Sequence, residues 1–222
     1  MLFRSREQGF LPEAICNYLA LLGWSPGDDV ENISMAELVK LFTVERVNSS
    51  PARFDMKKLE AINGDKIRAL TLDDFLTRAL PFLLKDGVIS GNADEVAVVR
   101  SALPIIQERI ARMNEVTAML KFLFIDEVRF DDESQSKIEE EPAQHVIAQA
   151  LEALRDLSDW SHETIEAALR SALIEKLGLK PRVAFGPVRI AVTGSHISPP
   201  LFESMELLGK DRSIARLTAA VR

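Results

Sequence analysis

The sequence predicts an all-α fold, and two observations lead to that prediction. In almost every long segment the apolar residues recur at steps of three and four, the period of a helix with one buried face. Ser, Thr and Asp residues that can cap helix starts stand directly before several of these segments. We therefore expect a helical bundle or cage, with a short irregular or extended segment near residues 181–199, where Pro181, Gly186 and Pro187 interrupt the pattern.

The first expected helix begins at Pro12, which suits a first turn, and Glu13 complements the positive end of the helix dipole. Gly23 is expected to end this helix in a backbone conformation that other residues enter only with strain. Cys16 lies within it and is expected to be a buried hydrophobe rather than a nucleophile. The apolar face of the helix comprises Leu11, Ile15, Tyr18, Leu19 and Leu22.

Three further helices are expected in the first half of the chain, and each has a capping residue at its start: Ser34, Asp55 and Thr71. Gly64 should end the second of them, and Pro81 should kink or end the third. The expected ranges are residues 34–42, 55–63 and 71–84.

In the second half, a helical run over residues 94–124 is expected to break at Pro104. Residues 126–141 hold eight acids and two bases with little apolar content, which predicts a loop or a solvated connector. Gly209 should separate the last two helices. The later expected helices span residues 143–157, 161–177, 200–208 and 211–221.

Length and composition limit the classes of protein to which the chain can belong. The 222 residues suffice for one large domain or two modest ones, and an apolar content of 47% allows a real core. The single cysteine excludes an internal disulfide framework. No apolar run approaches the ~20 residues that a membrane span requires. We therefore expect a cytoplasmic protein with no membrane partner.

The charge is unevenly distributed. A net charge of −7 argues against a generic binder of nucleic acids, and we expect no DNA partner. Residues 176–222, however, carry eight Lys or Arg against three acids. A basic face can exist on an acidic protein, so a local RNA-contacting patch and ordinary solvated charge both remain open.

The sequence shows no plausible catalytic or metal-binding constellation. The histidines His145, His162 and His196 are far apart and have no zinc-binding spacing. No glycine-rich phosphate-binding motif is present, and Ser195 lacks the GxSxG elbow of hydrolases. We assign no catalytic residue and no metal ligand.

Two segments of the first 70 residues resemble bacterial glutamyl-tRNA synthetases. GFLPEAICNYLALLGWS, from Gly9 to Ser25, is similar to the segment that follows the KMSKS-type loop of that family. NSSPARFD with the downstream KKL, Asn63 and Ile67-Arg68 is similar to the family pattern SPARFDxxKLxxxN…IR. The resemblance implies that residues 1–70 form a stem-contact region. It also implies that three cations approach tRNA phosphates there: Arg53, Lys58 and Arg68.

The rest of the chain resembles the anticodon-binding region of the same family, here residues 71–222 with a possible subdivision near residues 126–141. Arg109 matches a basic residue that approaches the third anticodon base. The segments FGPVRIAVTG, SPPLF and LLGKDR are similar to the family pattern PLRxALTG…P-LF…LLGxxR. The resemblance implies a pocket for the first anticodon base made by Arg189, Ser198, Pro199, Leu201 and Phe202. The alternative for the last two side chains is plain core.

The resemblance implies the tRNA-recognition portion of a class I enzyme that attaches glutamate to tRNA(Glu). ATP and Mg²⁺ would serve the full-length enzyme, and no cofactor is expected in this chain. The sequence contains neither a HIGH nor a KMSKS-type motif, so this chain alone should not form glutamyl-adenylate. We expect a monomer whose partner is tRNA(Glu). The alternative is a helical scaffold that docks a protein partner without binding RNA. The sequence leaves open whether tRNA(Gln) is also accepted, and whether a catalytic half lies outside this sequence or in another chain.

Overall fold

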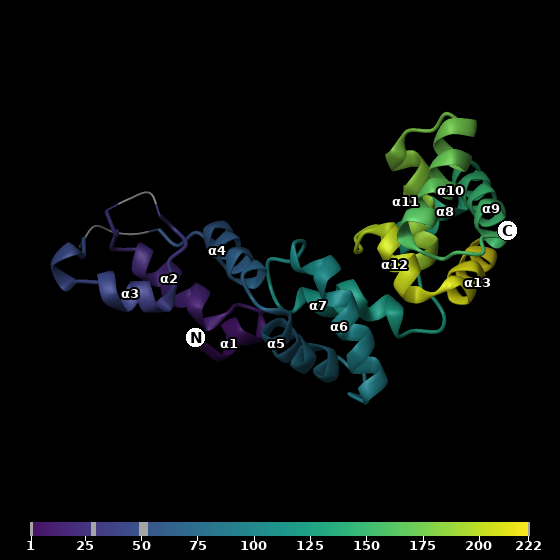
Figure 1. Ribbon diagram of the computed structural model, residues 1–222. Coiled ribbons are helices and arrows are strands. Elements are labelled where there is room, and N and C mark those ends of the chain that lie inside the picture. The colour runs from purple at the N-terminus through teal and green to yellow at the C-terminus, as the bar shows by residue number, and fades with distance from the viewer. Residues whose placement is uncertain (1, 28–29, 49–52, 222) are drawn as a thin grey trace. The chain divides into compact units, whose positions relative to one another are not determined.

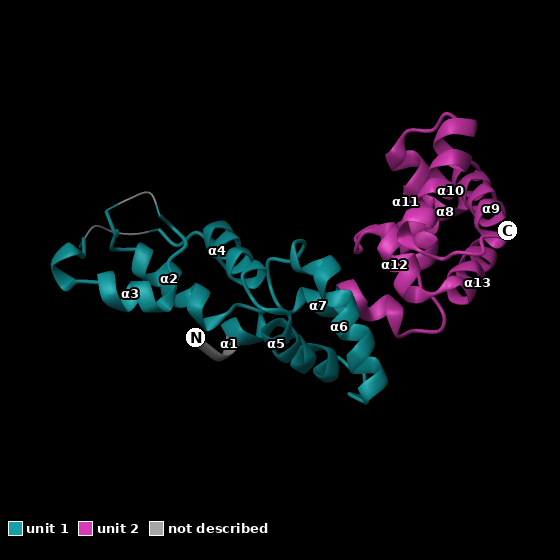
Figure 2. Ribbon diagram, viewed as in Figure 1, with its two compact units in different colours: residues 1–118 teal, residues 119–222 magenta. Residues whose placement is uncertain are grey.

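The computed structural model describes residues 2–27, 30–48 and 53–221 (Figure 1). Within these residues every regular element is helical and no strand occurs, so the all-α prediction is confirmed. The chain divides into two compact units, residues 1–118 and 119–222 (Figure 2). The functional boundary expected near residue 70 falls inside unit 1 and stays a prediction.

Unit 1 contains a series of short and medium helices, the last of which crosses the unit boundary at residue 118. They are α1 (Leu2–Glu7), α2 (Pro12–Leu21), α3 (Met35–Leu41), the 3₁₀ turn η1 (Val44–Arg46), α4 (Met56–Arg68), α5 (Leu72–Lys85), α6 (Ala93–Gln107) and α7 (Glu115–Leu120). The two pairs with the most extensive packing are α2 on α4 and α5 on α6.

A buried asparagine on α4, Asn63, links three segments of unit 1. Its side chain accepts a hydrogen bond from the Leu11 amide at 2.7 Å and donates to the carbonyls of Gly9 at 3.3 Å and Ala111 at 2.5 Å. Gly9 has a φ of +84°, and a Cβ there would lie 2.5 Å from the backbone nitrogen of Asn114. The turn before α2 is therefore held against α4 and the segment after α6, and it requires glycine.

Helices in unit 1 continue through three residues at which local signals predict a kink or an end. Helix α4 continues past Gly64 because this residue is buried and packs close to the backbone of Ala111. Helix α6 continues through Pro104, whose ring is exposed while Ile106 is fully buried; the break in this run comes instead at residues 108–114. Helix α5 likewise contains Pro81 and ends four residues later. Core burial outweighs the lost backbone hydrogen bond at each proline.

Two expectations for α2 are wrong. Gly23 does not adopt the left-handed conformation that was expected of it. Helix α2 ends earlier, at Leu21, and the next residue is still in a right-handed helical conformation. Cys16 is exposed, because it is two residues, or about 200° around the helix, from the buried Ala14 and Tyr18.

Unit 2 is built around α9, which packs against α11 and α13, with α12 packed on α10. Its core includes Ile147, Leu154, Ile165, Val188 and Leu217, all fully buried. Its elements are the 3₁₀ turn η2 (Lys121–Leu123), α8 (Asp132–Glu139), α9 (Glu141–Arg155), α10 (His162–Leu169), the π-helical segment η3 (Arg170–Lys176), α11 (Pro181–Thr193), α12 (Leu201–Leu208) and α13 (Lys210–Ala220).

Most of the segment expected to be extended near residues 181–199 is helical. Pro181 occupies the first turn of α11, where its missing N–H is harmless, and Pro187 lies inside a helix whose Ala184 and Val188 are fully buried. Only the part from Gly194 onward is irregular. The acidic connector over residues 126–141 also contains a helix, α8, because Asp131 caps its start by accepting the Ser134 amide at 2.7 Å.

Candidate nucleic-acid interface

Arg189 fixes the loop that follows α11. One of its guanidinium nitrogens, Nη1, donates to the Ser198 hydroxyl and to the Pro199 carbonyl, both at 2.7 Å. Gly194 begins the loop with a φ of +82°, and a Cβ there would lie 2.8 Å from a methyl carbon of Val128. Ser198 and Pro199 are both buried. The structure therefore brings three of the predicted pocket residues together, Arg189 on α11 and Ser198 and Pro199 in the loop that it holds.

The other two predicted pocket residues begin α12 and differ in exposure. Leu201 is only 3% exposed and belongs to the core, whereas Phe202 is half-buried. The Phe202 ring meets Phe185 edge to face, with centroids 5.3 Å apart. The guanidinium carbon of Arg170 lies 5.8 Å from the Phe185 centroid. These side chains form an aromatic cluster with a cation on it, an arrangement suited to stacking an unpaired base.

An open cavity of about 630 Å³ lies beside Arg189 in unit 2. We call it the α11 groove. Its apolar wall includes Val146, Phe185 and Pro187. Its charged lining consists of Lys137, Arg182, Arg189, His196 and a single acid, Glu140.

Sequence reasoning missed three of these four basic side chains: Lys137, Arg182 and His196. Lys137 comes from the segment expected to be a solvated connector, and its ammonium lies 2.6 Å from the Glu133 carboxylate. His196 lies near Asp131, at the start of α8. Hydrogen bonds from Ser134 lower the pKa of the Asp131 carboxyl, and the charge of nearby His196 lowers it further. Arg182 lies on α11 itself and His196 in the loop after it, so both are close to Arg189 in the sequence. Only Lys137 comes from another element, α8, and no local signal could have placed it at the groove.

The predicted stem-contact residues lie in unit 1 on and before α4. Arg53 is exposed, and it lines a small cavity of about 200 Å³ together with Lys58. The Lys58 ammonium lies 2.6 Å from the Glu31 carboxylate. Arg68 ends α4, where it pairs with Asp65.

Arg109 is exposed in the turn after α6. Several contacts, two of which follow, join this turn to the end of α4. The Gln107 side-chain amide donates to the Leu70 carbonyl at 2.9 Å, and Arg68 lies 4.0 Å from the Glu108 carboxylate. Arg68 and Arg109 are thus carried by neighbouring segments of unit 1. The five predicted pocket residues belong to unit 2, so their joint contact with one RNA loop stays a prediction.

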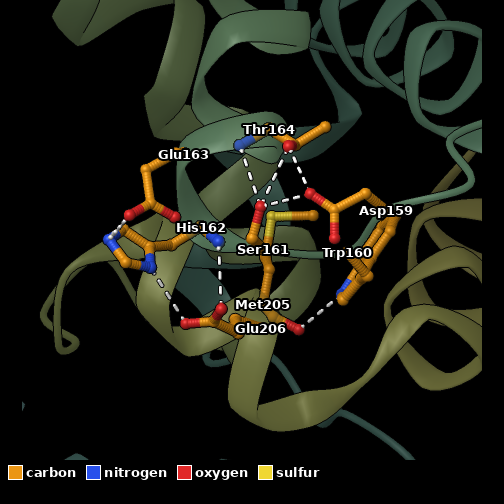
Figure 3. Close-up of polar contacts among 8 residues, drawn as sticks. All are labelled: Asp159, Trp160, Ser161, His162, Glu163, Thr164, Met205 and Glu206. Carbon is orange, nitrogen blue, oxygen red and sulfur yellow. Dashed lines mark hydrogen bonds and ion pairs between the residues drawn. The ribbon is translucent and has the colours of Figure 1, made fainter.

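A second polar cluster in unit 2 joins the start of α10 to the end of α12 (Figure 3). The Glu206 carboxylate accepts the His162 backbone amide at 3.2 Å and lies 3.0 Å from imidazole Nδ1. The other ring nitrogen, Nε2, lies 3.2 Å from Glu163. Burial lowers the pKa of His162, but the Glu206 hydrogen bond and the charges of Glu163, Glu206 and Glu203 raise it by more, so it lies above the ordinary value.

Among the described residues, His162, Glu163 and Glu206 also place potential metal-ligand atoms within 4.8 Å of one another. The two ring nitrogens, however, face different carboxylates, an arrangement that matches a doubly protonated imidazole bridging two acids. We therefore interpret the cluster as a link between helices. No helix in the described part of the chain is both long enough and apolar enough to cross a membrane.

Two family models match the chain. One, described as an anticodon binding domain, matches residues 74–221 and thus contains Arg109, Arg189 and the α11 groove. The other, described as the catalytic domain of class I tRNA synthetases (E and Q), matches residues 3–61. The fold and the matched regions define the chain as part of a class I aminoacyl-tRNA synthetase.

Similarity to curated relatives shows which family of class I aminoacyl-tRNA synthetases the chain belongs to. A glutamate–tRNA ligase of Nocardioides sp. is 50% identical over 220 residues, which cover 97% of this chain and 45% of the relative. The corresponding enzyme of Saccharopolyspora erythraea is 48% identical over 221 residues, covering 98% and 44%. A crystal structure of a glutamate tRNA ligase from Elizabethkingia meningosepticum matches with a TM-score of 0.78 at 26% identity, over 97% of this chain and 42% of that one. The chain belongs to the glutamate–tRNA ligase family, and it spans less than half the length of these relatives.

Proposed function

We propose that the chain is the tRNA-recognition portion of a glutamate–tRNA ligase and that it binds tRNA(Glu). The observation that carries the proposal is the Arg189–Ser198–Pro199 contact beside the α11 groove. An ordered loop loses little entropy on binding. A groove with four basic side chains attracts phosphate, and its aromatic wall can stack a base that has unstacked from the anticodon loop.

The proposal assigns separate tasks to the two units. In unit 1, Arg53, Lys58 and Arg68 contact the phosphates of the tRNA stem, and Arg109 contacts the third anticodon base. In unit 2, Arg189 and its loop receive the first anticodon base. Arg suits base contacts because its planar donors can meet base-edge acceptors or stack on a ring.

Attachment of glutamate with ATP and Mg²⁺ belongs, in this proposal, to the complete ligase. The residues described here do not fit Mg²⁺ or ATP, because the His162 cluster directs both of its carboxylates at an imidazole and the sequence has no glycine-rich phosphate-binding motif. The chain alone should therefore bind tRNA without forming glutamyl-adenylate. The proposal also places the protein in the cytoplasm as a monomer.

A filter-binding titration with unmodified tRNA(Glu) tests the proposal. Arg109→Ala and Arg189→Ala should each weaken binding about tenfold, since about 1.4 kcal/mol is lost with one charge-assisted contact. Arg155→Ala is the matched control, because this arginine is exposed on α9 and is absent from the lining of the α11 groove. Equal affinities for all three variants would refute the assignment of the site.

The same titration at low and high salt separates this proposal from the scaffold alternative. Phosphate contacts make RNA affinity fall steeply with salt, whereas an apolar protein interface is nearly insensitive to it. A chain that does not bind tRNA(Glu) at low salt would favour the scaffold. The match of an anticodon binding domain over residues 74–221 supports RNA binding instead.

A further inference from the structure

Large exposed apolar side chains are concentrated in one stretch of unit 1. Ten of those identified among the described residues lie between Leu19 and Met56. The other four are scattered over the remaining helices: Leu84, Val98, Val183 and Ile197. Single exposed apolar residues need no explanation, but such a concentration marks an interaction surface.

Helix α3 presents the clearest part of this surface. Met35, Val39 and Phe42 follow one another at steps of four and three residues, so they lie along one side of the helix. Their exposed fractions are 42%, 76% and 42%. We call these three residues the α3 face. Val44, in the turn that follows, is 74% exposed and extends the apolar stretch.

One edge of the α3 face rests on a small core. Leu38 packs in a cluster with Trp24 and Ile33, and the Phe42 ring centroid lies 5.6 Å from that of Trp24. The indole nitrogen of Trp24 is buried and has no hydrogen-bond partner among the described residues. A well-formed capping box at Ser34 makes the helix itself regular. Helix α3 is therefore ordered and is anchored at the Leu38 edge of the α3 face, while Met35 and Val39 remain exposed.

The comparisons indicate what covers the α3 face. The catalytic-domain family model matches residues 3–61, a range that contains all of α3, and more than half of each curated relative's length lies outside the match to this chain. We infer that the α3 face docks against the remainder of a class I synthetase catalytic domain. The inference rests on the proposed function, because that function identifies the partner as a synthetase catalytic domain. It assigns to α3 a contact with protein rather than with RNA.

Oxidative footprinting of Met35 tests the inference directly. The probe is a fusion in which this 222-residue chain replaces the matching part of the Nocardioides sp. ligase, and it is compared with the chain alone. Hydroxyl radicals should oxidise Met35 readily in the chain alone and at least tenfold more slowly in the fusion. Val39→Asp should restore fast oxidation in the fusion. Val98→Asp is the matched control, because Val98 is an exposed helix valine outside residues 3–61, and it should change nothing.

Two further measurements decide the other outcomes. Circular dichroism of the isolated Val39→Asp chain should match the unsubstituted chain, because Val39 is 76% exposed. Equal oxidation of Met35 in the chain and the fusion would overturn the inference, as would a dimer of the isolated chain that already protects Met35 and dissociates on Val39→Asp.

Isolated Val39→Asp should retain full affinity for tRNA(Glu). Protection of Met35 in the fusion, combined with no tRNA binding by the unsubstituted chain, would refute the proposed function and leave the docking intact.

Discussion

Arg216 on α13 offers the sharpest test of how unit 2 is held together. The side chain is 6% exposed and donates to three backbone carbonyls: Val192 at 2.7 Å, Phe122 at 2.8 Å and Ile125 at 2.6 Å. It thereby ties the end of α11 to the segment that follows the unit boundary. Burial, and then the charge of neighbouring Arg212, lower the pKa of Arg216 to about 10, so the buried guanidinium carries an electrostatic penalty of its own.

Arg216→Met removes the three contacts while keeping a long apolar side chain. The Val192 and Phe122 carbonyls lose their donor, whereas the Ile125 carbonyl keeps Arg212, which donates to it at 2.8 Å. Each buried carbonyl left without a donor costs about 1–3 kcal/mol, and relief of the buried charge offsets part of the sum. We expect a net loss of about 3 kcal/mol in the free energy of unfolding of unit 2. For a unit of this size the loss corresponds to a midpoint about 12 °C lower or more.

The assay is urea or thermal unfolding followed by tryptophan fluorescence, because Trp160 lies in unit 2 and Trp24 in unit 1. In a Trp24→Phe background, Trp160 reports on unit 2 alone. Arg212→Met is the comparison, since Arg212 is only part-buried and makes two such contacts, to Leu123 and Ile125 at 2.8 Å. A loss below about 1 kcal/mol for Arg216→Met would show that solvent replaces these contacts, and the reasoning would fail.

Three further outcomes are expected. Because the folded-state pKa of His162 is raised, the link to Glu206 and Glu163 should stabilise unit 2 fully below about pH 6.5 and lose effect as the pH rises through the raised value. His162→Gln should abolish this part of the pH dependence of urea unfolding, and an unchanged dependence would contradict the assignment. Gly9→Ala should destabilise unit 1 by more than about 2 kcal/mol in urea unfolding, because φ is +84° and a Cβ would meet backbone at 2.5 Å. Ser34→Ala should cost only about 1 kcal/mol, and a larger loss would mean that the cap holds more than α3.

Helix starts were predictable because their signals are local. Ser34, Asp55 and Thr71 each accept a hydrogen bond from an amide in the first turn of the following helix, as the sequence indicated. Helix interruptions were less predictable, since Pro104 and other interior prolines or glycines are tolerated where the flanking residues are fully buried. The sequence shows the penalty of such a residue but not the packing that compensates for it.

The residues of the candidate site show the same difference between local signals, which the sequence reveals, and tertiary packing, which it does not. Arg189, Ser198 and Pro199 could be selected because they lie within one contiguous segment that resembles a family pattern, and the structure shows them in direct contact. Lys137 reaches the same groove from α8, about 50 residues earlier in the chain, and only tertiary structure could bring it there.

The contacts of Arg189 also change what the residue is expected to do. Sequence reasoning gave it a base to read, yet its Nη1 already donates within the loop to Ser198 and Pro199. Its first role is therefore to position the loop. Reading of a base then depends on the loop backbone, on the ring of Phe185 and on the unforeseen cations of the groove. If that is so, Arg189→Lys should weaken tRNA(Glu) binding nearly as much as Arg189→Ala, because the lysine side chain is one atom shorter and its ammonium would not reach the two acceptors that Nη1 contacts at 2.7 Å.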